Sequence, residues 1–272
     1  MKPTDKSCPG AAFRIIDAHT HIGPCHLSGW HQRAASVPVE SMLQTCARLG
    51  IGSIVTAPHP LLQGHMEEAN RLCAQNVARF PGRVYGYISV VPRCGLAAVK
   101  NEIGTYAGKP GFVGLKFLPG YYHGALTAPE YAYAMDFANE AKCPVLCHIW
   151  DDDPHLSDVE AALRTRRGMR FILAHQGGGH SAETDRAARL LQTYENVFME
   201  LCGSLENHYG VEDIVALAGE DRVIFGTDQI NLDPKYELGR VLFAPLTDRV
   251  KQKIFAENFL SLLGDSQLDR IR

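Results

Sequence analysis

The 272-residue sequence lacks an excess of charge of either sign, a long apolar run and grouped cysteines. Lys and Arg number 27 and Asp and Glu number 30, so the net charge of −3 gives no basic footprint for nucleic acid or an anionic membrane. No stretch approaches the roughly 18 apolar residues of a membrane span. Residues 1–10 lack the apolar core of a secretory signal. We therefore expect a cytoplasmic protein without nucleic-acid or membrane partners.

The cysteines are scattered along the chain, and none belongs to a Cys-x-x-Cys pair, which excludes a zinc ribbon. Disulfide frameworks occur mainly in short secreted chains, so we expect reduced thiols. The eight residues are Cys8, Cys25, Cys46, Cys73, Cys94, Cys143, Cys147 and Cys202.

Apolar runs rich in β-branched and aromatic residues recur along the sequence, and helical patterns fill most of the intervals. Nearly continuous apolar strands are typical of parallel sheets that are buried on both faces. The predicted strands are Phe13–Ala18, Ser53–Ala57, Val84–Val90, Phe112–Phe117, Pro144–Ile149, Arg170–Ala174, Val197–Leu201 and Arg222–Gly226.

Eight strands that alternate with helices predict an α/β fold, a single (β/α)₈ TIM barrel over residues 13–272 after an N-terminal tail of residues 1–12. The apolar spacing predicts a helix over Met66–Phe80, and Thr247 is the expected N-cap of a later helix. Two small domains would also fit the length, but no linker or change of composition divides the chain. An open doubly wound sheet is the other alternative.

Ionisable residues follow four of these strands at their carboxyl ends, the face at which barrel enzymes hold their active sites. His19 and His21 stand just beyond the first strand, and two residues that are two positions apart in extended chain point the same way. His148 and His175 end strands five and six, and Asp228 ends strand eight. Imidazole and carboxylate are ligands of zinc and similar ions. The pattern therefore predicts a divalent-metal centre built from these five residues.

Two further residues are candidates for substrate binding. Glu200 is a carboxylate in an otherwise apolar strand, and it must find a partner because an unpaired buried charge is costly. A structural ion pair is its alternative role. Arg93 follows strand three and offers a bidentate fork that suits a substrate carboxylate.

Other polar features are weaker candidates. His59 and His65 follow strand two and are further candidates for contact with a substrate carboxylate. Asp151–Asp153 is more typical of a solvated loop and helix start than of an ion site. Gly177–Gly179 has no Gly-Lys-Ser/Thr after it, so we interpret it as a flexible loop above the metal and not as a P-loop.

The sequence resembles the amidohydrolase superfamily, most closely the branch that includes aminocarboxymuconate-semialdehyde decarboxylase and related hydrolases. The resemblance covers about residues 15–264. Its motifs are specific for the superfamily and unspecific for the substrate. The matching stretches are Asp17–His21, Gly111–Lys116, Pro144–His148, Leu173–Gly178, Phe225–Asp228 and Glu257–Gly264.

The resemblance implies one metal with four ligands, and a fifth residue, His175, close to the nucleophilic water. In binuclear relatives a carboxylated lysine on strand four bridges two ions, and Lys116 has that position here. We expect one ion, Zn²⁺, with Lys116 unmodified; a second ion bound by His148, His175 and Lys116 is the alternative. The implied ligands of the first ion are His19, His21, His148 and Asp228.

A metal-activated water would make the protein a hydrolase of an amide, lactone or ester in a small molecule. Asp228 would accept the proton of the water, and His175 would help to stabilise the oxyanion. A non-oxidative decarboxylase of a small carboxylic acid is the main alternative, with Asp228 or His175 delivering a proton to carbon. A non-catalytic metal-binding barrel is a more remote one. The sequence leaves open whether the chain forms a homo-oligomer.

Overall fold

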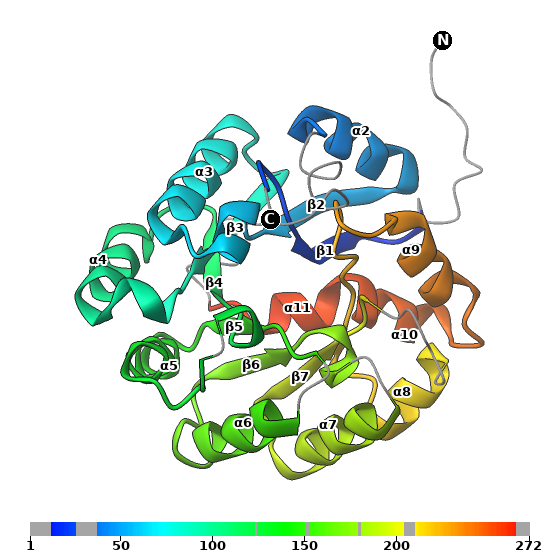
Figure 1. The fold of residues 1–272 in the computed structure, drawn as a ribbon. Helices are drawn as coiled ribbons and strands as arrows, with labels where there is room; N and C mark the ends of the chain where they lie inside the picture. Colours follow the sequence, from blue (N-terminus) through cyan, green and yellow to red (C-terminus); the bar gives the residue numbers. More distant parts are fainter. Residues whose placement is uncertain are drawn as a thin grey trace.

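In a computed structural model, the chain forms a (β/α)₈ barrel. Eight parallel strands pair in the order β1-β2-β3-β4-β5-β6-β7-β8, and the helices surround them (Figure 1). The predicted TIM barrel is confirmed. The structure describes residues 12–25, 37–122, 124–150, 153–178, 181–203 and 210–264, without the side chains of 153–155 and 181–183. The predicted N-terminal tail (apart from residue 12), Asp151, Asp152 and Gly179 lie outside the described residues.

The strands lie close to the predicted runs, but their ends differ because hydrogen-bonded pairing, not apolar composition, defines a strand. The first strand begins and ends two residues later than predicted, so that His19 lies inside it and not beyond it. The last strand keeps only two residues. The strands are β1 Ile15–Thr20, β2 Ile51–Thr56, β3 Val84–Ser89, β4 Phe112–Phe117, β5 Pro144–Cys147, β6 Arg170–Leu173, β7 Val197–Glu200 and β8 Val223–Ile224.

The connections after the strands carry helices, several of them preceded by a short 3₁₀ turn. The α-helices are α2 Val39–Leu49, α3 Met66–Arg79, α4 Leu96–Tyr106, α5 Pro129–Ala141, α6 Asp153–Thr165, α7 Ser181–Thr193, α8 Val211–Ala218, α9 Pro234–Phe243, α10 Asp248–Gln252 and α11 Asn258–Ser261. The 3₁₀ turns are η2 His59–Gln63, η3 Pro92–Cys94, η4 Gly120–Tyr122 and η5 His175–Gly177, and a π-helical turn, η6 Lys253–Glu257, joins α10 to α11.

Local sequence signals explain how these helices begin and which face they bury. Helix α3 buries Met66, Ala69, Cys73 and Val77, the stripe that the apolar spacing predicts. The side chain of Thr247 accepts a hydrogen bond from the backbone N–H of Val250 at 3.3 Å, which confirms it as the N-cap of α10. None of the described helices is long and apolar enough to cross a membrane. The seven described cysteines are all free thiols.

The barrel closes where the first strand meets the segment after β8. Ala18 N–H donates to the carbonyl of Phe225 at 3.1 Å, and Asp228 N–H donates to the carbonyl of His19 at 2.8 Å. His21 N–H donates to the carbonyl of Gln229 at 2.6 Å. These bonds continue the sheet from β8 to β1, which rules out the open doubly wound alternative.

The carboxylate of Asp17 reinforces this seam from inside the protein. It is fully buried and accepts hydrogen bonds from Thr227 N–H (3.0 Å), Thr227 Oγ1 (2.5 Å), Gln229 Nε2 (2.9 Å) and His19 N–H (3.2 Å). One side chain of β1 therefore binds the residues on both sides of Asp228. The seam fixes Asp228 relative to the first strand.

Replacing Asp17 with Ala should lower the free energy of unfolding by about 2–4 kcal/mol, because buried donors lose their acceptor. Urea denaturation of the metal-free proteins measures the change. Asp136→Ala is the control: its carboxylate is 60% exposed and pairs with Arg166 on the surface. That loss should stay below about 1 kcal/mol. Equal losses in the two variants would contradict a structural role for Asp17.

Candidate metal centre

The structure brings the predicted site residues to the carboxyl-terminal end of the barrel. His19 is in β1 and His21 directly follows it; His148 directly follows β5, and His175 begins η5 just after β6. Asp228 follows β8 and has a left-handed backbone, with φ of 53°. Consecutive parallel strands end at the same face of a barrel, so side chains that are distant in sequence meet there.

The rings of His19 and His21 are oriented by acceptors on their Nδ1 sides. Nδ1 of His19 lies 3.2 Å from Oε2 of Glu200, and Nδ1 of His21 lies 2.6 Å from the carbonyl oxygen of Ala57. A ring that donates its Nδ1 proton keeps a lone pair on Nε2, and metal-ligating histidines are commonly held in this way. Both Nε2 atoms are therefore prepared to bind a cation.

Asp228 completes this group. Its Oδ1 atom lies 3.2 Å from Nε2 of His21 and 4.0 Å from Nε2 of His19, and it accepts a hydrogen bond from Asn231 Nδ2 at 3.2 Å. Burial raises the pKa of Asp228, but the contact with His21 and the attraction of the nearby histidines together outweigh it and hold the pKa well below its usual value. The carboxylate is therefore ionised at neutral pH.

His148 and His175 form a contacting pair beside this group. Nδ1 of His148 lies 2.8 Å from Nε2 of His175, and the His175 ring centroid lies 5.2 Å from that of His19. Burial lowers the pKa of His175 to about 4 and holds those of His148 and His19 well below their usual values. Neutral imidazoles keep the lone pairs that a metal requires.

Lys116 projects from β4 to the same place. Its side chain is fully buried, and Nζ lies 2.7 Å from Nε2 of His19. Burial lowers the pKa of Lys116. The lysine thus contacts the atom of His19 that we expect to bind metal, and its modification state stays a prediction.

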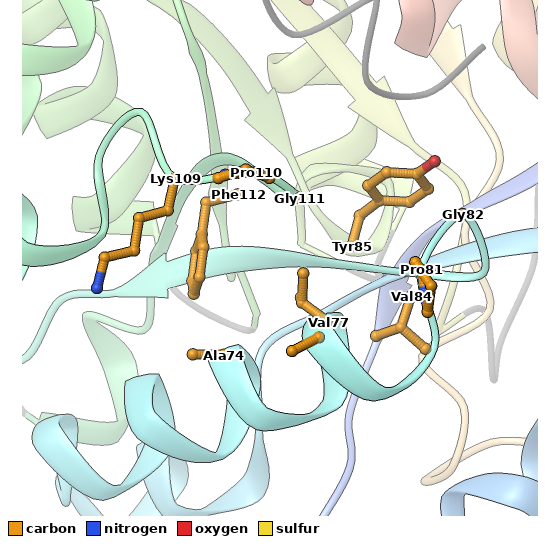
Figure 2. Close-up of a pocket in the computed structure, with 11 residues that line it drawn as sticks. Ala74, Val77, Pro81, Gly82, Val84, Tyr85, Lys109, Pro110, Gly111 and Phe112 are labelled. Carbon is orange, nitrogen blue, oxygen red and sulfur yellow. The ribbon is translucent and has the colours of Figure 1, made fainter.

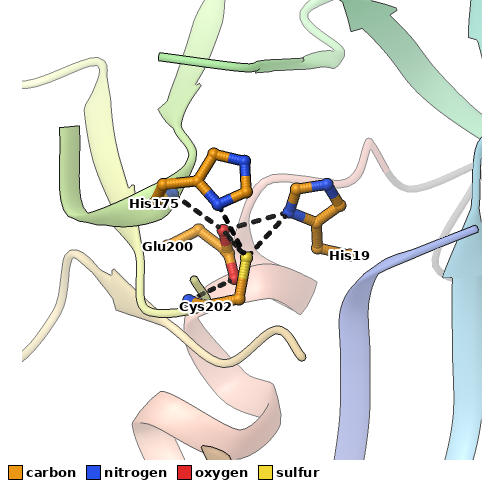
Figure 3. A group of neighbouring side chains, drawn as sticks. All are labelled: His19, His175, Glu200 and Cys202. Atoms are coloured by element: carbon orange, nitrogen blue, oxygen red, sulfur yellow. Dashed lines mark hydrogen bonds and ion pairs between the residues drawn. The ribbon is translucent and has the colours of Figure 1, made fainter. Parts of the chain in front are cut away.

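The donor atoms fit a divalent cation. One nitrogen of His19, one of His21 and a carboxylate oxygen of Asp228 all lie within 4.8 Å of one another, with a neutral His19 and an ionised carboxylate. This donor set suits Zn²⁺ and other first-row ions. A second group in the described part of the chain meets the same criterion: His19, His175, Glu200 and Cys202 (Figure 3). Neither group includes His148, whose Nδ1 atom faces His175.

The remaining sequence candidates are spread around the centre. Glu200 lies behind the histidines, fully buried. The Arg93 guanidinium lies over the ring of Tyr122, 5.6 Å from its centroid, and the residue is exposed. His59 is buried and stacks on His21 with ring centroids 5.5 Å apart, whereas the exposed His65 faces Glu68. Of these four residues, Glu200 and His59 contact the predicted ligands through hydrogen bonds or ring contacts.

The sequence patterns predicted no role for Asp17, Cys202, Tyr121 or Trp150. Asp17 had a signal, because it is a carboxylate in an apolar strand, as Glu200 is. Cys202 resembled the other scattered cysteines, yet its Sγ atom lies 3.1 Å from Nδ1 of His19. The rings of Tyr121 and Trp150 contact His148 and His175 edge-on, at centroid distances of 5.2 and 5.4 Å.

A separate apolar pocket of 390 Å³ lies at the amino-terminal ends of β3 and β4 (Figure 2). Val77, Val84, Tyr85 and Phe112 line it, with Lys109 at one edge. It lies at the end of the barrel away from the histidines, and its walls offer no group of metal ligands. The chemistry is therefore expected at the carboxyl-terminal face.

Comparison with solved structures places the fold among known enzymes. The chain superposes on a 2,6-dihydroxybenzoate decarboxylase from Rhizobium with a TM-score of 0.75 and 16% identity, over 94% of this chain and 99% of that chain. A dihydroxybenzoic acid decarboxylase from Polaromonas, crystallised with manganese and 2-nitroresorcinol, gives 0.75 and 14%, over 95% and 98%. A 5-carboxyvanillate decarboxylase from Sphingomonas paucimobilis gives 0.73 and 14%, over 92% and 99%. Similarity at this level of identity establishes the fold.

The sequence itself decides the family. No curated protein gives a significant match. Residues 16–264 match a family model described as amidohydrolase, and this range holds all the motifs that carried the resemblance. The resemblance is therefore confirmed, and the chain belongs to the amidohydrolase family.

Proposed function

We propose that the protein is a metal-dependent non-oxidative decarboxylase of a small aromatic carboxylic acid. The observation that carries the proposal is the convergence of His19, His21 and Asp228 at the carboxyl end of the barrel, with His175 beside them. The similar structures named as decarboxylases support this reaction over the hydrolysis that the sequence first suggested. Tyr121 and Trp150 support an aromatic substrate, since flat rings pack well on aromatic side chains.

His19, His21, His148 and Asp228 would hold one divalent ion. The sequence favoured Zn²⁺, and a similar decarboxylase was crystallised with manganese, so Zn²⁺ and Mn²⁺ are the two ions to test. When bound, the ion would supply positive charge that attracts a substrate carboxylate and stabilises negative charge in the transition state. The acceptors on Nδ1 of His19 and His21 keep the two rings in place for this task.

The protein's own residues must supply the proton that replaces the departing carboxyl group. The bond between the ring carbon and the carboxyl carbon breaks, its electron pair stays on the ring carbon, and a proton joins that carbon as CO₂ leaves. Asp228 and His175 are the groups that we assign to this proton. Asp228 is ionised, so it must first take up a proton from the substrate or solvent; general acid–base help of this kind contributes about 10²–10⁴-fold.

Hydrolysis of an amide, lactone or ester is the second candidate. The ionised Asp228 favours it, because a carboxylate next to a metal can accept the proton of an attacking water. The two reactions differ in what water contributes. Hydrolysis places a water oxygen in a product, whereas decarboxylation places only a solvent hydrogen on carbon.

Isotope labelling with a panel of hydroxylated aromatic carboxylic acids and of aromatic amides, lactones and esters should separate the two reactions. For the true substrate we expect CO₂ release equal to substrate loss, one deuterium on the product carbon in D₂O, and no ¹⁸O in the aromatic product in H₂¹⁸O. Treatment with a chelator should abolish turnover, and Mn²⁺ or Zn²⁺ should restore it. Product that gains ¹⁸O without CO₂ release would establish a hydrolase.

Substitutions at the site should separate metal binding from proton transfer. Asp228→Asn keeps an oxygen near the ion but removes the basic carboxylate, so turnover should fall at least about 100-fold while metal content falls much less. His19→Ala should lower both, because a ligand is lost. His175→Ala should resemble Asp228→Asn in a mononuclear site and His19→Ala if His175 holds a second ion.

Metal content and turnover must be measured on the same preparations. His65→Ala is the matched control, since the exposed His65 pairs with Glu68 and contacts none of the proposed ligands; both quantities should stay at the wild-type level. Near-normal turnover in Asp228→Asn would end the proposal that Asp228 moves the proton.

A further inference from the structure

Glu200 ends β7 beneath the two histidines that Figure 3 shows on either side of it. Its carboxylate is fully buried and receives four contacts from donors. Oε2 lies 3.2 Å from Nδ1 of His19, 3.3 Å from the backbone N of His175 and 3.0 Å from Sγ of Cys202. Oε1 accepts from the backbone N–H of Cys202 at 2.8 Å.

The contacts of Glu200 act on both functional histidines. At His19 the carboxylate fixes the ring, so that Nε2 faces the Asp228 side of the site. At His175 it binds the backbone N–H of a residue with φ of 56°, a left-handed conformation that a residue with a side chain adopts only when neighbouring groups hold it. The Glu200 carboxylate therefore links His19, an expected metal ligand, to His175, an expected proton carrier.

Neighbouring residues are shaped around this carboxylate. Gly226 leaves room for it, because a Cβ atom at that position would lie 2.2 Å from Oε1 of Glu200. The Cys202 thiol lies 3.1 Å from Nδ1 of His19 and 3.3 Å from Nδ1 of His175, so it fills the space between the rings. Because Glu200 is fully buried, it would act on a bound substrate only through the histidines.

We propose that Glu200 is a positioning residue that sets the metal affinity of the centre through His19 and holds the backbone of His175. The proposal rests on the metal centre of the proposed function and not on the identity of the reaction. It assigns Cys202 the role of a hydrogen-bond donor to Glu200 and not that of a metal ligand. Outer partners of this kind commonly change metal affinity about 10–100-fold when they are replaced.

The test measures the affinity of the metal-stripped full-length protein for Zn²⁺ alone, by competition with a chromophoric chelator. Glu200→Gln should weaken Zn²⁺ binding about 10–100-fold, because the amide cannot accept all four donors. Glu200→Asp keeps the negative charge on a side chain that is one methylene group shorter, and it should weaken Zn²⁺ binding less than Glu200→Gln does. Cys202→Ser keeps a donor to Glu200 and should leave the affinity within about 3-fold of the wild type.

Glu102→Gln is the matched control, since Glu102 is also a buried carboxylate but binds Asn70 Nδ2 at 2.9 Å, away from the centre. Its Zn²⁺ affinity should equal that of the wild type. If Glu200→Gln does not fold, as judged by circular dichroism, Glu200→Asp decides the question. Wild-type affinity in the folded Glu200 variants would overturn the proposal.

The spectrum of the Co²⁺-loaded protein tests the role of Cys202. We expect no thiolate-to-metal charge-transfer band, and such a band would overturn the proposal by making Cys202 a ligand. Neither measurement uses a substrate, so each result stands even if the protein proves to be a hydrolase.

Discussion

The closure of the barrel between β1 and the segment after β8 is the constraint on which the site depends. The His-x-His pair and Asp228 are about 200 positions apart in the sequence, and they become neighbours only because the seam pairs their backbones. The buried carboxylate of Asp17 binds Thr227 and Gln229, the two residues that flank Asp228. The same hydrogen bonds that complete the fold therefore bring together the residues that we propose as metal ligands.

Burial is the second constraint, because the barrel holds several ionisable groups without exposure to solvent. It raises the pKa of Asp17 to about 7 and that of Glu200 above its usual value, and it lowers those of Lys116 and His19. Such groups are tolerated only with hydrogen-bonding partners, and each of the four has them. The neutral imidazoles of His19, His148 and His175 lie near the ionised carboxylate of Asp228. A divalent cation bound there would balance the negative charge of that carboxylate.

The sequence predicted the barrel and the convergence of the five site residues, because both follow from local patterns. Apolar runs mark buried strands, and the ionisable residues that follow four of these runs mark the carboxyl-terminal face. The sequence could not place Glu200 behind His19, or turn His148 toward His175, because side-chain directions depend on partners from other strands. The sequence also placed His19 beyond the first strand, because it could not show that pairing with β2 extends β1 through Thr20. The sequence also could not identify the substrate, since the residues that line a site come from loops without a local sequence signature.

Anomalous diffraction from crystals of the Mn²⁺- or Zn²⁺-loaded protein locates the bound ion and identifies its ligands. The expected result is one ion per chain, bound by Nε2 of His19, Nε2 of His21, His148 and a carboxylate oxygen of Asp228, with Lys116 unmodified. Glu200 should remain behind His19, outside the ligand sphere. An ion between the Nδ1 atoms of His19 and His175 with Cys202 as a ligand, or two ions bridged by a carboxylated Lys116, would contradict it.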